Sequence, residues 1–200
     1  MDIMIDLETL GSERLDCVFP LIGFATFDPN GEGVMGAGVI KLDAQDQIER
    51  GLSVDWGTIQ WWLRQEEAAR MQLQTDPIEE AYSLTEGLAT LARWFSNAGF
   101  EPERDRVWAY PSDFDLSILR HAHAVAGMPT PWHRRDTRDA KTFLKASGLR
   151  REFVEESVPA EFSIGPDEPE RMVKHRPDHD AVRQVYYVQA AARAIGGTDW

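Results

Sequence analysis

Carboxylates at three separate places in the sequence could together bind a divalent cation. The first pair, Asp6 and Glu8, follows the apolar residues 3–5. Residues two apart on a strand point to the same side, so these two carboxylates are expected to lie close together. Like charges at that distance are unfavourable unless a cation neutralises them, and oxygen ligands favour Mg²⁺ or Mn²⁺. The alternative is a solvated strand end, because Asp-x-Glu is a common pattern.

A further aspartate lies at the start of a predicted helix in the middle of the chain. The segment SDFDL, residues 112–116, comes directly after a short predicted strand. Asp115 falls in the first helical turn and is the candidate ligand from this segment. Asp113 is interpreted as the N-cap residue, a position where aspartate is strongly preferred.

The third group, KHRPDHD at residues 174–180, precedes the last predicted helix. Proline at position 177 is typical of the first helical residue, which leaves Asp180 in the first turn. His175 would then lie on the preceding loop, from which it could reach the same point as Asp180. His179 is interpreted as a residue of the helix surface. The alternative for the whole group is a surface loop with capping acids.

The elements that must position these residues can be predicted from turn signals and hydrophobic periodicity. Residues 3–7, 19–27 and 33–42 are apolar and have short connections, which predicts an antiparallel meander of three strands. A short strand is predicted at 107–109, and helices are predicted over 58–73, from 76–77 to about 98, and over 114–126, 139–146 and 178–195. This order favours a mixed sheet flanked by helices.

Composition limits the class of protein. The chain has 200 residues, enough for one domain or a domain with an insertion, and a hydrophobic content of 42%. No apolar run is long enough for a membrane helix, no signal peptide is visible, and the single cysteine, Cys17, fits a reducing compartment, so we expect a cytoplasmic protein with no membrane partner. The net charge of −13 opposes binding to nucleic acid unless cations offset the carboxylates.

Taken together, the three groups resemble the DEDDh branch of the DnaQ-like 3′–5′ exonucleases over residues 3–192. The matching motifs are Asp-x-Glu at Asp6 and Glu8, an aspartate after a strand at Asp115, and His-x4-Asp from His175 to Asp180. The set MIDLETLG, TIQWWL, DFDLSIL, PW and RDAKT is similar to the DexA-like phage exonucleases and their mycobacterial exoribonuclease relatives.

This resemblance implies an α/β, ribonuclease H-like fold with a mixed five-stranded sheet flanked by helices. We expect residues 1–200 to form a single domain, and the many acidic residues at about 150–174 predict a loop insertion there. The implied activity is metal-dependent 3′–5′ hydrolysis of RNA or single-stranded DNA with a free 3′ end, releasing nucleoside 5′-monophosphates. Relatives in this branch can be dimers, so a homodimer is our hypothesis for the oligomeric state.

The resemblance also assigns roles to the residues of the three groups. Two Mg²⁺ or Mn²⁺ ions would be bound by Asp6, Glu8, Asp115 and Asp180. His175 would be the general base that takes a proton from the attacking water, a task that suits imidazole because it titrates near neutral pH.

Further residues are candidates for binding the substrate. Thr9 and Leu10 follow Glu8 directly, and the resemblance implies that they contact the terminal nucleotide. Trp61 is predicted on a polar helix face, where it could stack on a base or fill a subunit interface, whereas Trp62 is predicted in the core.

Basic residues after Trp132 are candidates for phosphate contacts. Arg138, with Arg134 and Arg135, either contacts phosphates or belongs to a solvated loop. Two rival hypotheses remain for the chain as a whole. The first is a catalytically silent nucleic-acid-binding module on the same fold, and the second is an acidic protein whose motif matches are accidental.

Overall fold

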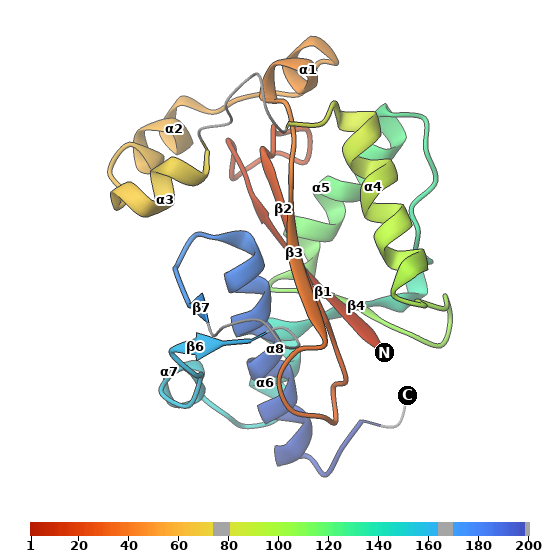
Figure 1. The fold of residues 1–200 in the computed structure, drawn as a ribbon, viewed down its shortest axis with the longest axis vertical. Helices are drawn as coiled ribbons and strands as arrows, with labels where there is room; N and C mark the ends of the chain where they lie inside the picture. The colour runs from red at the N-terminus through yellow and green to blue at the C-terminus, as the bar shows by residue number, and fades with distance from the viewer. Residues whose placement is uncertain (74–80, 164–169, 199–200) are drawn as a thin grey trace.

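The computed structural model describes residues 1–73, 81–163 and 170–198 (Figure 1). Its strands are β1 (Asp2–Glu8), β2 (Leu21–Phe27), β3 (Gly36–Lys41), β4 (Val107–Ala109), β5 (Thr137–Asp139), β6 (Glu161–Phe162) and β7 (Glu170–Arg171). Its α-helices are α1 (Ala44–Glu49), α2 (Trp56–Trp62), α3 (Glu67–Gln72), α4 (Leu84–Asn97), α5 (Ser112–Val125), α6 (Ala140–Ala146), α7 (Arg151–Glu155) and α8 (Pro177–Ala194).

One mixed sheet of five strands forms the centre of the molecule, in the order β3-β2-β1-β4-β5. The first three strands form the predicted antiparallel meander, whereas β4 and β5 run parallel to β1. β1 is therefore the central strand, and its C-terminal end lies at the same edge of the sheet as the C-terminal end of β4. Ligands in α/β sheets bind at the C-terminal ends of such strands.

Helices cover both faces of this sheet, which confirms the predicted fold class (Figure 1). α4 and α5 pack on the face that carries Ile3, Ile5 and Leu7, and α8 and α6 pack on the face that carries Met4. Alternate residues of β1 thus belong to two different cores, which explains why this strand begins as a continuous apolar run. Asp6 and Glu8 point to the face of Met4, the face that α8 crosses.

Several predicted helix boundaries differ from the observed ones. The helix predicted over 58–73 is two helices, since α2 ends at Trp62 and α3 begins at Glu67. The start predicted at 76–77 lies outside the described residues, and α4 begins at Leu84 after a capping box between Ser83 and Glu86. The short elements α1 and β5 were not predicted, because a few residues carry too little periodicity.

The acidic stretch 150–174 contains more structure than the predicted loop. Its described part contains α7 and the two-stranded antiparallel pairing of β6 with β7. Two residues of this stretch, Val154 and Phe162, are buried, each about 6% exposed, and they anchor it against the core beside α8.

Within the described residues, no helix is both long and apolar enough to cross a bilayer.

Candidate active site

Asp6 and Glu8 lie at the C-terminal end of β1, under the first turn of α8. Gly23 is paired with Asp6 across β1 and β2, and a Cβ atom on residue 23 would lie 2.0 Å from the carbonyl carbon of Pro177. The missing side chain therefore lets the start of α8 approach the sheet next to Asp6. Gln184 on the same helix donates from Nε2 to Oδ1 of Asp6 at 2.6 Å.

Asp115 reaches the same strand end from α5. The helix begins at Ser112, directly after β4, so Asp115 is in its first turn, as predicted. Asp115 is only 3% exposed, and its Oδ1 accepts a hydrogen bond from the backbone N–H of Leu7 at 3.0 Å. The N-cap assignment of Asp113 is wrong: this residue also lies in the first turn, after the N-cap Pro111.

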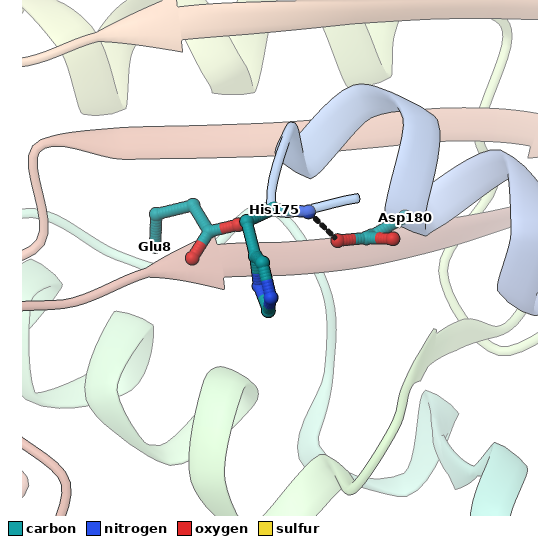
Figure 2. Close-up of side chains that lie close together, drawn as sticks. All are labelled: Glu8, His175 and Asp180. Carbon is teal, nitrogen blue, oxygen red and sulfur yellow. Dashed lines mark hydrogen bonds between the residues drawn. The ribbon is translucent and has the colours of Figure 1, made fainter. Parts of the chain in front are cut away.

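His175 and Asp180 complete the group from the loop and the first turn of α8. Single ligand atoms of Glu8, His175 and Asp180 all lie within 4.8 Å of one another. Figure 2 shows the three side chains together, with the backbone N–H of His175 donating to Oδ2 of Asp180 at 2.7 Å. His175 has a φ of 60°, a conformation that is uncommon for residues other than glycine, and this hydrogen bond helps to hold it.

The electrostatics of the group favour a bound cation. Burial raises the pKa of Asp6 well above its ordinary value, and the charges of the three neighbouring carboxylates raise it further. Burial also raises the pKa of Glu8, with Asp180 and Asp115 as the next causes. The pKa of Asp115 is raised to about 7 by burial, although the N–H of Leu7 opposes the shift.

These shifts have one physical origin. Carboxylates that are buried together repel one another when ionised, and a divalent cation removes that repulsion. All the ligand atoms that the four acids offer are oxygens, which suits Mg²⁺ or Mn²⁺. The residues present therefore fit a divalent cation.

Two residues of α8 that the sequence analysis did not single out contact the acids. Arg183 donates from Nη1 to Oδ1 of Asp180, and its Nε lies 3.3 Å from Oε1 of Glu155. Burial raises the pKa of Asp180, but the charge of Arg183 opposes that rise. Arg183 and Gln184 follow Asp180 by three and four residues, so helical spacing was a signal that could have identified them.

A pocket of about 640 Å³, here called the tryptophan pocket, has Glu8 in its wall. Trp62 is 3% exposed, as expected for a core residue, and its Nε1–H donates to the carbonyl oxygen of Thr9 at 2.9 Å. Trp61 is 43% exposed, and its ring centroid lies 5.1 Å from that of His175 in an edge-on arrangement. The pocket is lined by Leu7, Glu8, Thr9, Ser12, Glu13, Asp55, Gly57, Thr58, Trp61, Trp62 and Phe114.

The other predicted substrate residues differ in their positions. Thr9 lines the tryptophan pocket, with its hydroxyl group donating to the carbonyl oxygen of Gly11 at 2.7 Å. Leu10 packs against the core instead. Arg138 lies on β5, and the charges that act on it belong to Arg106, Asp2 and Asp136. Because Asp2 is at the opposite end of β1 from Glu8, the fold does not bring Arg138 to the carboxylates.

The prediction that His179 lies on the helix surface is wrong. Its side chain is fully buried, and Nδ1 accepts a hydrogen bond from the backbone N–H of Val173 at 2.9 Å. The ring also lies 5.0 Å from the ring of Phe162 in β6. His179 therefore attaches the loop that carries His175 to α8, an interaction between segments that no local pattern predicts.

Comparisons with known proteins agree with this geometry. Residues 1–192 match the model of a protein family described as the Rv2179c-like 3′-5′ exoribonuclease domain. No curated protein matches the chain. Solved structures with a similar fold include nucleases of low sequence identity.

Three of these structures illustrate the range of sequence identity and of chain coverage. The nuclease domain of 3′hExo, described as a DEDDh family member bound to rAMP, is 9% identical, with a TM-score of 0.58 over 94% of this chain and 89% of that one. Cell-death related nuclease 4 is 10% identical, with a TM-score of 0.56 over 94% and 62%. E. coli exonuclease I in complex with a dT13 oligonucleotide is 16% identical, with a TM-score of 0.55 over 96% and 40%.

These likenesses establish the fold. The chain spans about 40% of the length of the exonuclease I chain. The family model covers almost the whole chain and adds the activity. The chain therefore belongs to the family of Rv2179c-like 3′–5′ exoribonuclease domains.

Proposed function

We propose that this domain removes nucleotides one at a time from the 3′ end of RNA, with release of nucleoside 5′-monophosphates. The observation that carries the proposal is the convergence of Glu8, His175 and Asp180 within 4.8 Å, next to the buried Asp6 and Asp115. The name of the family supports RNA as the substrate. Single-stranded DNA is the alternative, since the neighbouring exonuclease I was solved with dT13.

Asp6, Glu8, Asp115 and Asp180 would hold two divalent cations, Mg²⁺ or Mn²⁺. When bound, such ions supply Lewis-acid stabilisation of the negative charge that develops on the phosphate and the leaving oxygen. The four carboxylates would be held in fixed positions, because they come from the end of β1 and from the first turns of α5 and α8.

The tryptophan pocket would bind the terminal nucleoside. Glu8 is in its wall, so a nucleoside there could present its 5′-phosphate to the carboxylates. Trp61 is partly exposed in the wall of this pocket and offers a surface on which a base can stack. Trp62 and Thr9 would shape the pocket, because the indole of Trp62 holds the backbone of Thr9.

His175 would act as the general base. Its ring lies edge-on to the indole of Trp61, and one of its ring nitrogens lies within 4.8 Å of carboxylate oxygens of Glu8 and Asp180. It would accept a proton from a water molecule as the water oxygen forms the new bond to phosphorus. The bond between phosphorus and the 3′ oxygen of the next nucleotide then breaks, and that oxygen takes a proton from solvent.

The test uses 5′-labelled single-stranded RNA and DNA of one sequence, with Mg²⁺, Mn²⁺ or EDTA. We expect a ladder that shortens from the 3′ end, that EDTA abolishes, and that is faster on RNA. Asp180→Asn should give no ladder while remaining folded. Intact substrate with every metal would support the silent binding module instead.

A homodimer remains our proposal for the assembly. It is supported by three apolar residues, Trp56 on α2, Leu63 directly after α2 and Met71 on α3, which are 66%, 61% and 50% exposed. Apolar side chains exposed together are typical of subunit interfaces. Sedimentation at micromolar concentration should give a dimer, whereas Leu63→Glu should give a monomer.

A further inference from the structure

A second pocket of about 330 Å³, here called the basic pocket, adjoins the carboxylates. Asp6, His175 and Asp180 form part of its wall, and it shares no lining residue with the tryptophan pocket. The remaining wall contains Arg151 and Lys174, together with Arg183 and two tyrosines. The carboxylate group therefore contributes to two pockets, because Glu8 lines the tryptophan pocket whereas Asp6 and Asp180 line the basic pocket.

The charge of the basic pocket is unusual for this chain. A protein with a net charge of −13 repels a polyanion at long range, so nucleic acid needs local positive charge near the site. Arg183 does not supply it, because its side chain is 10% exposed and bound to Asp180 and Glu155. Arg151 and Lys174 are the basic residues of this wall that reach solvent.

Arg151 is already oriented toward the pocket. Its guanidinium lies over the rings of Tyr110 and Tyr187, at 5.5 and 5.7 Å from their centroids. Its nearest carboxylate contact is Oε2 of Glu155, at 3.8 Å from Nε, which is too long for a hydrogen bond. Arg151 also shares a side-chain hydrogen bond with Tyr187, and the other N–H donors of its five-donor guanidinium can bind a phosphate.

We propose that Arg151, with Lys174, binds the phosphate that lies one linkage upstream of the scissile one. This inference rests on the proposed function. With the terminal nucleoside in the tryptophan pocket, the scissile phosphate lies at the carboxylates. The next nucleotide then enters the basic pocket, and its own 5′-phosphate meets Arg151. The preferred substrate thus has at least two phosphates near its 3′ end.

The experiment compares two trinucleotides that differ in one linkage. The first has natural phosphates throughout. In the second, the linkage upstream of the scissile one is a methylphosphonate, which carries no charge. For the unmodified protein, we expect kcat/KM to fall by about ten- to a hundredfold on the methylphosphonate, the effect of a lost hydrogen bond to a charged group.

The variant Arg151→Ala should lose a similar factor on the natural trinucleotide and little more on the methylphosphonate. The matched control is Arg150→Ala. Arg150 precedes Arg151, but it lies over the ring of Phe153, 3.6 Å from Glu152, and does not line the pocket. This control should keep the sensitivity of the unmodified protein. Arg151→Lys keeps the charge, so it should retain part of the sensitivity even if Arg151→Ala folds poorly.

Two outcomes would overturn the inference. If Arg151→Ala cleaved both trinucleotides at the rates of the unmodified protein, another residue would bind that phosphate. If it slowed both trinucleotides equally, Arg151 would act at the reacting phosphate or on the released product. Failure of the proposed function is distinguishable, because the unmodified protein would then cleave neither trinucleotide with any metal.

Discussion

The backbone of Pro177 passes so close to Gly23 that any side chain on residue 23 would overlap it. An added Cβ atom would lie 2.0 Å from the carbonyl carbon of Pro177 and 2.4 Å from the backbone nitrogen of Asp178. Both contacts are to backbone, so they cannot be relieved by rotation of a side chain. The distance between α8 and the sheet, and with it the distance between Asp180 and Asp6, depends on this glycine.

The first prediction follows from that contact. Gly23→Ala should displace the start of α8, reduce nuclease activity more than tenfold, and destabilise the fold by about 1–3 kcal/mol. The matched control is Gly36→Ala on β3, where a Cβ atom would meet only the hydroxyl of Thr26 at 3.1 Å. The measurement is the nuclease activity and the thermal unfolding of both variants, each compared with the unmodified protein. Unchanged activity in Gly23→Ala would mean that the position of α8 does not govern the site.

The second prediction concerns the carboxylate with the most like-charged neighbours. Asp6→Asn removes a charge that Asp115, Glu8 and Asp180 all disfavour, so the protein in EDTA should be at least as stable as the original. Activity with Mg²⁺ should fall at least about a hundredfold, since an amide is a poorer ligand than a carboxylate. The control is Asp113→Asn, an exposed aspartate two residues before Asp115 in the first turn of α5. Loss of folding in Asp6→Asn would contradict this account.

The third prediction is a pH dependence of stability without metal. The four acids have raised pKa values in the folded protein, about 7 for Asp115, so the folded state binds more protons than the unfolded chain at mildly acidic pH. The free energy of unfolding in EDTA should therefore fall as pH rises from about 4 through about 7.

Chemical unfolding at a series of pH values measures this slope. Mg²⁺ should stabilise the fold more above pH 7 than at pH 5, because the carboxylates must be deprotonated to bind it. In Asp6→Asn the slope should be smaller, since one of the titrating groups is missing. A free energy of unfolding that rises with pH over the same range would refute the assigned pKa directions.

The fourth prediction separates two neighbouring tryptophans. Trp62→Ala should destabilise the fold by about 3–5 kcal/mol, because a buried ring and its hydrogen bond to Thr9 are lost. Trp61→Ala should change stability much less, since Trp61 is 43% exposed. Its effect should be a rise in KM of about tenfold, the loss of one stacked base. Steady-state kinetics and thermal unfolding would distinguish the two variants. An unchanged KM in Trp61→Ala would show that Trp61 does not bind the substrate.

The sequence by itself determined the central strands, the acidic motifs and their order. Asp6 and Glu8 share a strand face because strands have a period of two, and Asp115 and Asp180 fall in first helical turns because turn signals precede them. These features are local, so a pattern of a few residues contains them. The resemblance to the DEDDh exonucleases rested on the same local patterns, and the family match bears it out.

Only the tertiary structure decided which residues surround these acids. The burial of His179, the contacts of Gln184 with Asp6 and of Arg151 with Tyr110, and the distance of Arg138 from the site all depend on how α7, α8 and β5 pack against the sheet. Such contacts join residues that are far apart in the chain. Their geometry is fixed by packing across the sheet, at positions such as Gly23. The local periodicity of a sequence does not predict such packing.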